Sequence, residues 1–338
     1  MPADLRVAAF TQGLDVPSAR FRVRQYVSAL AERGVALDEY PAAFGSYPPP
    51  GLLERLQWLP RAVIERRRTV AHTTADVALV QREMVSTLAT AESVWRGPML
   101  FDVDDAVWLH QRLGGADRIA RRSNAVICGN AFIAEHFAPF ARTVILPTAV
   151  DTGRYVPGPR AASPVLCWSG SSSGLPYLEA LAPQLRQLMQ AIPDATLRVI
   201  SNAPPRLEGV PRVEYVRWSP ETEITALQGA WCGLMPMPDT PWTRGKCSYK
   251  MLTYMACAVP AVVSPWGMNA EVLAQGDGAV GARDHEWADV LTSLLRDPAR
   301  IAPMGQAGRE IVQRSYAVDT LAGRLAQTLR EVAAEGAA

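Results

Sequence analysis

Lysine is almost absent from this sequence. Only Lys246 and Lys250 are lysines, and every other cationic residue apart from four histidines is arginine. The five cysteines are scattered without a C-x-x-C pair, which argues against a disulfide framework or a zinc site and favours a reducing, cytoplasmic location. No apolar run reaches the ~20 residues that a membrane helix needs, and no signal peptide precedes the first strand. The net charge of +1 gives no indication of a nucleic-acid partner.

The chain is long enough for two domains. It has 338 residues, of which 49% are hydrophobic and 20% charged, so two cores of ordinary size can be buried. Strand, turn and helix patterns alternate on both sides of the proline-rich segment 155–164, which predicts an interdomain linker. We expect an α/β fold of two Rossmann-like, doubly wound domains facing across a cleft, at residues 1–156 and 157–314, with a further helix at 315–338.

The first strand and helix offer candidate ligand contacts. Residues 5–10 are predicted to form a buried strand, and Gly13 in the next turn allows a ligand to approach the backbone. A helix is expected from Pro17 to about Arg33. Its first turns carry Arg20, Arg22 and Arg24. These arginines form either a solvated face or a cationic wall above the strand ends, where ligands bind in open α/β sheets.

A second basic segment follows at residues 52–72, where the pattern predicts one or two amphipathic helices with five arginines. Such a face can bind anionic lipid. Because it is more often ordinary protein surface, peripheral membrane contact is the less favoured interpretation.

Three carboxylates gather at the end of the strand expected at 98–103, namely Asp102, Asp104 and Asp105. They could bind a metal, orient an acceptor hydroxyl or transfer a proton. Asp104 or Asp105 could also cap a following helix. Spacing alone does not separate these interpretations.

Both lysines lie in the segment 242–271, with Arg244 just upstream. A helix through this segment would place Lys246 and Lys250 on one face, at i and i+4. Three cations near a helix start predict an anion site suited to a diphosphate. The alternative is an amphipathic helix with a solvated basic edge.

A turn of small residues follows the strand expected at 165–168. Its members, Gly170, Ser171, Ser172 and Ser173, could cradle a phosphate with backbone N–H groups and hydroxyls. The turn matches neither the P-loop nor the dinucleotide fingerprint, so a plain flexible turn is an equal alternative. The helix after it is expected to run from Leu175 to Ala191, and residues 266–271 are expected to form a loop.

Several motifs together resemble a known family. They are Asn124–Asn130, Pro147–Asp151, Met255–Val263 and Gly267–Glu271, which resemble the retaining GT-B-fold glycosyltransferases of family 4 over nearly the whole chain. Phe101–Asp105, with its DVDD letters, and Arg244–Cys247 with Lys250 resemble a bacterial subgroup. The chain departs from the family where Gly245 and Thr253 replace the two glutamates that usually contact the donor sugar and the ribose.

The resemblance implies transfer of a sugar from a nucleotide diphosphate sugar to an acceptor, with retention and without a bound metal or permanent cofactor. Arg244, Lys246 and Lys250 would neutralise the leaving diphosphate. Gly13, the turn at 170–173, Asn269 and Glu271 would bind the donor. Asp104 or Asp105 would orient the acceptor, with Asp102 and the arginines of the first helix on the acceptor side. The last helix would cross back to the first domain.

Other functions stay open at this point. A nucleotide-sugar epimerase or a phosphorylase-like enzyme could use the same fold. The missing glutamates also leave room for a non-catalytic protein that binds nucleotide sugars. The donor sugar, the acceptor and the oligomeric state do not follow from the sequence.

Overall fold

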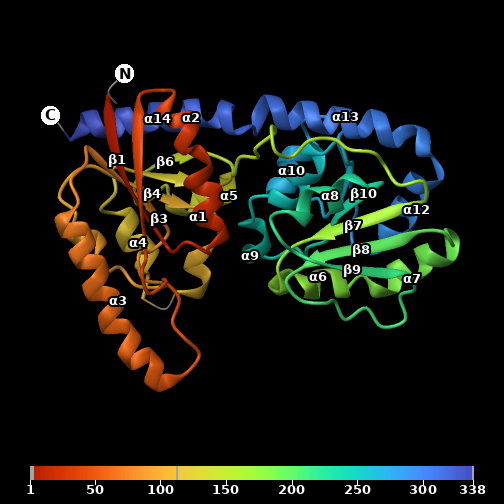
Figure 1. Cartoon of the computed structure of the whole chain (residues 1–338), viewed down its shortest axis with the longest axis horizontal. Helices are drawn as coiled ribbons and strands as arrows, with labels where there is room; N and C mark the ends of the chain where they lie inside the picture. The colour runs from red at the N-terminus through yellow and green to blue at the C-terminus, as the bar shows by residue number, and fades with distance from the viewer. Residues whose placement is uncertain (1–3, 112, 337–338) are drawn as a thin grey trace. The chain divides into compact units, whose positions relative to one another are not determined.

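The protein is described here by a computed structural model that covers residues 4–111 and 113–336. The chain divides into two compact units (Figure 1). Unit 1 takes the residues up to Ala149, Gly245–Cys247 and those from Val318 onward, and unit 2 takes Val150–Arg244 and Ser248–Ala317. The first boundary therefore lies before the proline-rich segment rather than at 156/157. The first lysine, Lys246, belongs to unit 1 together with its two neighbours in the sequence.

Unit 1 is built on a parallel sheet in the order β2-β1-β3-β4-β5-β6. The strand order reverses between β1 and β3, so the loops after these two strands flank the position where open α/β sheets bind ligands. The central strands are short apolar runs, as expected for strands covered on both faces. Their bounds are β1 Leu5–Thr11, β2 Val35–Pro41, β3 Val77–Gln81, β4 Met99–Val103, β5 Ala125–Cys128 and β6 Arg142–Ile145.

The last helix of the chain packs on the sheet of unit 1, where Leu321, Leu325 and Leu329 join the core formed by β1, β3, β4 and β5. The helix expected at 17–33 is interrupted at Val23, whose φ of −128° is not helical. The α-helices are α1 Pro17–Arg22, α2 Val27–Ala31, α3 Leu52–His72, α4 Gly115–Ala120, α5 Ala131–Phe137 and α14 Val318–Glu335; the short 3-10 helices are η1 Arg24–Tyr26, η2 Glu92–Val94 and η3 Val107–His110.

Unit 2 has a second parallel sheet, in the order β12-β11-β10-β7-β8-β9. Counted from its own first strand this is the order 3-2-1-4-5-6 of dinucleotide-binding folds, with the reversal between β7 and β10. The bounds are β7 Val165–Ser169, β8 Thr196–Ser201, β9 Val213–Arg217, β10 Cys232–Met235, β11 Ala261–Val263 and β12 Ala279–Gly281. The small-residue turn leaves β7 and therefore lies at this reversal.

Helices cover both faces of the second sheet. Leu185, Leu291 and Ile301 bring α7, α12 and α13 into one core with the strands. Tyr254 of α10 packs on Gly233, whose neighbours in β10 face that core, so α10 covers the opposite face. The helices are η4 Ser172–Gly174, α6 Leu175–Glu179, α7 Ala182–Ala191, α8 Thr222–Gln228, α9 Pro241–Arg244, α10 Tyr249–Ala256, α11 Met268–Leu273, α12 Trp287–Arg296 and α13 Pro298–Ser315.

Two expectations for unit 2 were wrong in detail, and one short helix was not expected. The helix expected at 175–191 is two helices, α6 and α7, and Pro183 lies in the first turn of the second. The loop expected at 266–271 contains the start of α11, and α9 was not expected. Among the helices of residues 4–111 and 113–336, none is long and apolar enough to cross a bilayer.

Candidate active site

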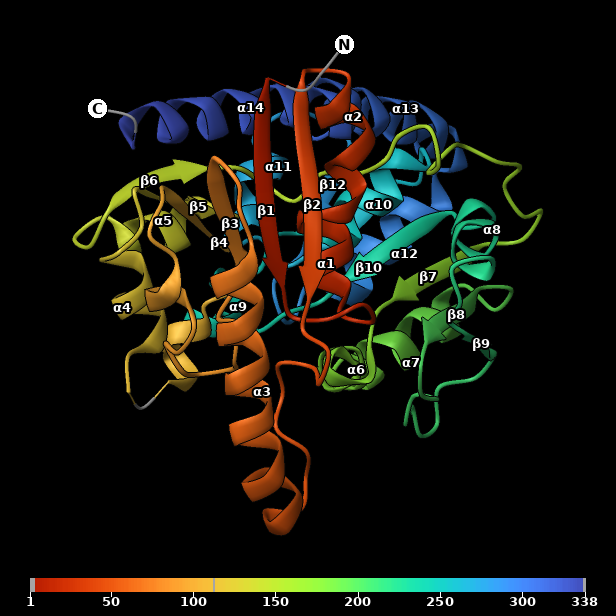
Figure 2. The ribbon, with the colours of Figure 1, turned by 60° about the vertical axis from the view of Figure 1, so that its left-hand side comes forward.

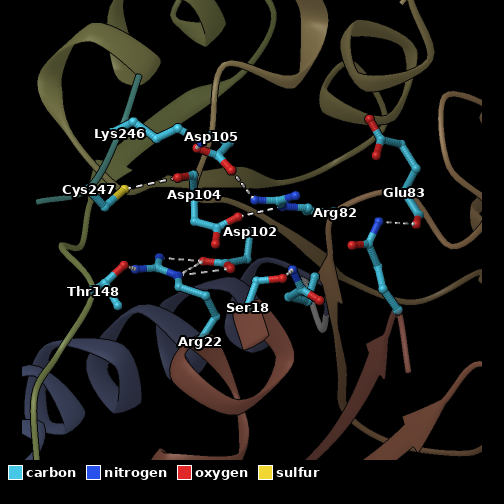
Figure 3. A network of polar contacts seen from close by, with 12 residues as sticks. Ser18, Arg22, Arg82, Glu83, Asp102, Asp104, Asp105, Thr148, Lys246 and Cys247 are labelled. Atoms are coloured by element: carbon cyan, nitrogen blue, oxygen red, sulfur yellow. Dashed lines mark hydrogen bonds and ion pairs between the residues drawn. The ribbon is translucent and has the colours of Figure 1, made fainter. Parts of the chain in front are cut away.

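Helix α1 and the ends of β3 and β4 carry a chain of ion pairs in unit 1 (Figure 3). At its buried end, Arg22 of α1 pairs with Asp102 of β4, with 2.5 Å between Nη2 and Oδ1 and side-chain exposures of 1% and 3%. Arg22 also donates to the carbonyl of Leu146 at 2.9 Å and to the hydroxyl of Thr148 at 3.4 Å. Burial raises the pKa of Asp102, and Arg22 opposes this rise.

Arg22 is therefore neither on a solvated face nor on an open cationic wall. Arg24 departs from those two interpretations as well, because it pairs with Glu39 at 2.7 Å and donates to the carbonyls of Gly13 and Leu14. Arg20 stacks over the ring of Phe21, 4.4 Å from its centroid. Gly13 has a φ of +146°, which explains why this turn needs glycine. Of these three arginines, Arg24 thus stabilises the turn after β1.

Arg82 is the centre of the more accessible end of the chain of ion pairs. Its Nε lies 2.5 Å from Asp104 and its Nη2 lies 2.6 Å from Asp105. Burial alone would raise the pKa of Asp104, but Arg82, Arg22 and Lys246 outweigh it and lower this pKa. Asp104 is consequently an ionised hydrogen-bond acceptor at neutral pH. Neither aspartate caps a helix, since no side-chain cap bond is made at the following η3.

Arg82 has a φ of +55°, an uncommon backbone conformation for an arginine. Strain of this kind concentrates at functional sites. Sequence reasoning did not identify Arg82 as a site residue. No local pattern marks it, because its role depends on the pairing of β3 beside β4, which brings Gln81 opposite Asp102.

Lys246 completes this network within unit 1. Its Nζ donates to Oδ1 of Asp105 at 2.8 Å, and its carbonyl accepts from the side chain of Asn130 at 3.0 Å. Cys247 Sγ donates to the carbonyl of Asp104 at 3.0 Å. Gly129 allows this approach, because a Cβ there would overlap the Cys247 sulfur. The tripeptide Gly245–Cys247 is thus held on unit 1 by its own backbone as well as by the lysine.

The second lysine has different surroundings. The helix α10 begins at Tyr249, after Ser248 with a φ of +50°, so Lys246 is outside the helix and the expected i, i+4 pair is not formed. Lys250 Nζ lies 5.3 Å from the centroid of the Trp168 ring in unit 2. A Cβ on Gly170 would come within 2.5 Å of Lys250 Cε, and one on Gly174 within 3.6 Å of its Nζ. The lysine therefore runs along the small-residue turn.

The turn itself offers hydroxyls more than backbone N–H groups. The N–H groups of Gly170, Ser172 and Gly174 donate to Ile200, Asn202 and Ser171. The side chains of Ser171 and Ser173 are exposed, and their hydroxyls lie 2.8 Å apart. Most of the backbone N–H groups expected to bind phosphate thus donate to acceptors within unit 2. The serine hydroxyls and Lys250 lie at the same turn.

The remaining donor-side candidates divide into exposed and buried residues. Arg244 is exposed and forms a bidentate pair with Asp239, at 2.7 and 2.9 Å. Glu271 is exposed in the first turn of α11. Asn269 is completely buried, accepts from Ser248 at 2.7 Å and donates to the carbonyl of Ser264 at 2.9 Å. Its side chain stabilises the turn before α10 instead of facing a ligand.

The site therefore consists of two separate arrangements of charge. In unit 1, two cations neutralise two carboxylates, a set that can accept hydrogen bonds from hydroxyls. In unit 2, an ammonium and serine hydroxyls lie beside an aromatic ring, a set that can bind an anion. Within the described residues, no group of three or more His, Cys, Asp or Glu side chains is placed to hold a metal ion.

Comparisons with known proteins place this geometry in context. Residues 183–329 match the family described as "Glycosyl transferase-like". A GDP-mannose-dependent alpha-(1-6)-phosphatidylinositol monomannoside mannosyltransferase of Mycolicibacterium smegmatis is 30% identical over 228 residues, which are 58% of this chain and 58% of that protein. The matched part is thus little more than half of the length of this relative.

Solved structures match nearly the whole chain in fold. Sucrose-phosphate synthase from Thermosynechococcus elongatus gives a TM-score of 0.75 at 16% identity, over 98% of this chain and all of that chain. HepE of Anabaena, in complex with UDP and glucose, gives 0.71 at 14% identity, over 96% and 99%. The two Rossmann-like units therefore have the fold of GT-B glycosyltransferases.

Proposed function

We propose that the protein is a retaining glycosyltransferase that takes a sugar from a nucleotide diphosphate sugar. The observation that carries the proposal is the position of Lys250 beside the small-residue turn, at the strand-order reversal of unit 2. Ligands of doubly wound sheets bind at such reversals. An ammonium there can stabilise the charge that develops on a leaving diphosphate, which is the largest charge that this reaction creates.

The other candidates take narrower roles in this proposal. Ser171 and Ser173 donate hydroxyl hydrogen bonds to the diphosphate, and Glu271 accepts from the ribose or the sugar hydroxyls. Asp104 and Asp105, both paired with Arg82, orient an acceptor hydroxyl. Arg244 and Lys246 serve as diphosphate ligands only by exchanging Asp239 and Asp105 for phosphate oxygens.

The identity of the donor is proposed from the relatives. The mycobacterial protein is named for GDP-mannose, and HepE was solved with UDP-glucose. A hexose on GDP or UDP is therefore the first class to test. A lipid-linked or saccharide acceptor follows from the phosphatidylinositol monomannoside in the name of the same relative.

A thermal-shift comparison tests the donor site. A donor present at about a hundred times its Kd stabilises the protein by about 2.7 kcal/mol, which corresponds to a rise of roughly 5–10 °C for a domain of this size. GDP, UDP, GDP-mannose and UDP-glucose are the probes. Lys250→Met keeps an unbranched side chain at this position but removes the ammonium, and should abolish the shift. Arg186→Ala, which removes a half-buried cation elsewhere in unit 2, should retain it.

Product analysis then tests the chemistry. Transfer to a mannoside or phosphoinositide acceptor should give a product whose anomeric configuration, read by NMR, matches that of the donor. An inverted product would refute retention. Binding without transfer or donor turnover would favour a non-catalytic nucleotide-sugar-binding protein, and an isomerised donor without an acceptor would favour an epimerase.

A further inference from the structure

Helix α3 is anchored to unit 1 by only half of its length. Its buried residues are Ala62, Arg66 and Val70, which recur every four positions in the C-terminal half and so share one face. Arg66 donates to the carbonyl of Tyr40 and lies over the ring of Phe10. None of the residues 52–61 is buried. The C-terminal half therefore packs on unit 1, while the N-terminal half extends beyond the other elements of that unit (Figure 2).

The free half of α3 presents large apolar side chains. Leu52, Leu56 and Leu59 are 74%, 66% and 38% exposed, and their i, i+4, i+7 spacing places them on one helix face. Leu53 is 76% exposed, and the loop before the helix adds Phe44 at 51%. The indole N–H of Trp58 donates to the Phe44 carbonyl at 3.0 Å and keeps that loop beside the helix. We name the set Leu52, Leu53, Leu56, Leu59 and Phe44 the α3 apolar surface.

The charge around this surface indicates the chemistry of its partner. Helix α3 contains five arginines and two glutamates, a formal charge of +3, whereas the whole chain carries +1. Arg55, Arg61, Arg67 and Arg68 are exposed. Exposed leucines and arginines on a helix whose N-terminal half is not packed on unit 1 are typical of helices that lie in a lipid interface. Long basic side chains can place their apolar stems along the acyl boundary and their heads at the phosphates.

We propose that the N-terminal half of α3 docks on the surface of an anionic lipid membrane. The α3 apolar surface enters the boundary between headgroups and acyl chains, and the exposed arginines contact lipid phosphates. This attachment does not depend on the proposed transferase activity. It would hold the ion-pair network of unit 1 near molecules that are themselves embedded in the membrane.

Vesicle co-sedimentation of the full chain tests the proposal. The chain should bind vesicles of equimolar phosphatidylcholine and phosphatidylglycerol, and should bind pure phosphatidylcholine at least about tenfold more weakly. Leu53→Glu/Leu56→Glu should weaken binding to anionic vesicles by about tenfold or more. Leu113→Glu, at a leucine of unit 1 that is 65% exposed outside α3, is the matched control and should bind as the wild type does.

A second pair of variants tests the charge. Arg61→Glu/Arg68→Glu should weaken anionic binding by about tenfold or more, and Arg118→Glu on α4 should leave it unchanged. Because all of these side chains are exposed, circular dichroism should show an intact fold. No binding to anionic vesicles, or equal loss in the α3 variants and their controls, overturns the proposal. So does a dimer, seen by light scattering, that Leu53→Glu/Leu56→Glu dissociates while vesicle binding is unaffected.

Discussion

The buried pair of Arg22 and Asp102 gives the sharpest test of how unit 1 is stabilised. Replacing Asp102 by alanine leaves the Arg22 guanidinium almost completely buried. Among the described residues, its remaining hydrogen-bond acceptors are then the Leu146 carbonyl and the Thr148 hydroxyl. Removing one partner of a buried ion pair costs about 3–5 kcal/mol, because the remaining charge is no longer compensated. We expect Asp102→Ala to lower the free energy of unfolding of unit 1 by this amount.

The double variant Arg22→Met/Asp102→Leu separates the stranded charge from the loss of packing. Replacing a buried ion pair by an apolar pair of similar volume often leaves the free energy of unfolding unchanged. Here the Leu146 carbonyl also loses its donor, which should lower the free energy of unfolding by about 1–3 kcal/mol. The double variant should therefore be more stable than Asp102→Ala. Asp38→Ala, which breaks the exposed 3.8 Å pair with Arg6 in the same sheet, is the control and should cost at most about 1 kcal/mol.

Hydrogen exchange read by mass spectrometry is the suitable assay, because two units need not unfold together. Peptides that cover β4 and the segment after β6 report on unit 1 alone. If their amides exchange through unfolding of the unit, a loss of about 3 kcal/mol accelerates exchange by about a hundredfold. Exchange in Asp102→Ala no faster than in Asp38→Ala would refute the reasoning. A double variant as unstable as Asp102→Ala would show that the stranded charge is not the cause.

Two further predictions concern the same network, and a third concerns the cysteines. The folded-state pKa of Asp104 is lowered, so its ionised form contributes to the free energy of unfolding above the ordinary carboxyl pKa of about 4, and this contribution is lost as the pH falls further. The difference in the free energy of unfolding between the wild type and Asp104→Asn should therefore become smaller in acid. A difference that does not change with pH would contradict this. Gly129→Ala should destabilise unit 1 by about 1–3 kcal/mol in a denaturant titration, because its Cβ overlaps the Cys247 sulfur. Adding Cys247→Ala to the same chain should restore part of the lost stability. No restoration would exclude that overlap as the cause. All five cysteines are buried, and burial raises the pKa of the Cys128 thiol to about 12. A thiol reagent should therefore react with them at neutral pH only after denaturant is added. Rapid reaction with the native chain would show that the interior opens.

The strands could be predicted from the sequence because burial on both faces leaves a local signal. Short runs such as residues 125–128 and 261–263 are continuously apolar and end at turn residues, and they fold as β5 and β11. The order of the strands leaves no such signal. The role of Arg82 depends on that order, since only the pairing of β3 with β4 brings it to Asp104 and Asp105.

The lysine segment shows where local patterning fails. Helical spacing predicted that Lys246 and Lys250 share a face, but the backbone turns at Ser248, whose hydroxyl donates to the buried Asn269. Neither glycine nor proline marks this break, so the sequence around it gave no warning. The interaction that stabilises the turn comes from a residue 21 positions away. Tertiary contacts of this kind override local propensity.

The two positions where the family's glutamates are missing have physical explanations in the fold. A Cβ at Gly245 would lie 2.6 Å from the Cβ of Ala106 and 2.8 Å from its backbone nitrogen, so a glutamate cannot enter without moving that backbone. Thr253 is 3% exposed and donates to the Lys250 carbonyl at 2.8 Å within α10. Both positions are therefore committed to packing. If this chain transfers a sugar, the carboxylate that contacts the donor has to come from another element. Glu271, which is exposed on α11, is the candidate. Its removal should then lower turnover and leave diphosphate binding at Lys250 intact.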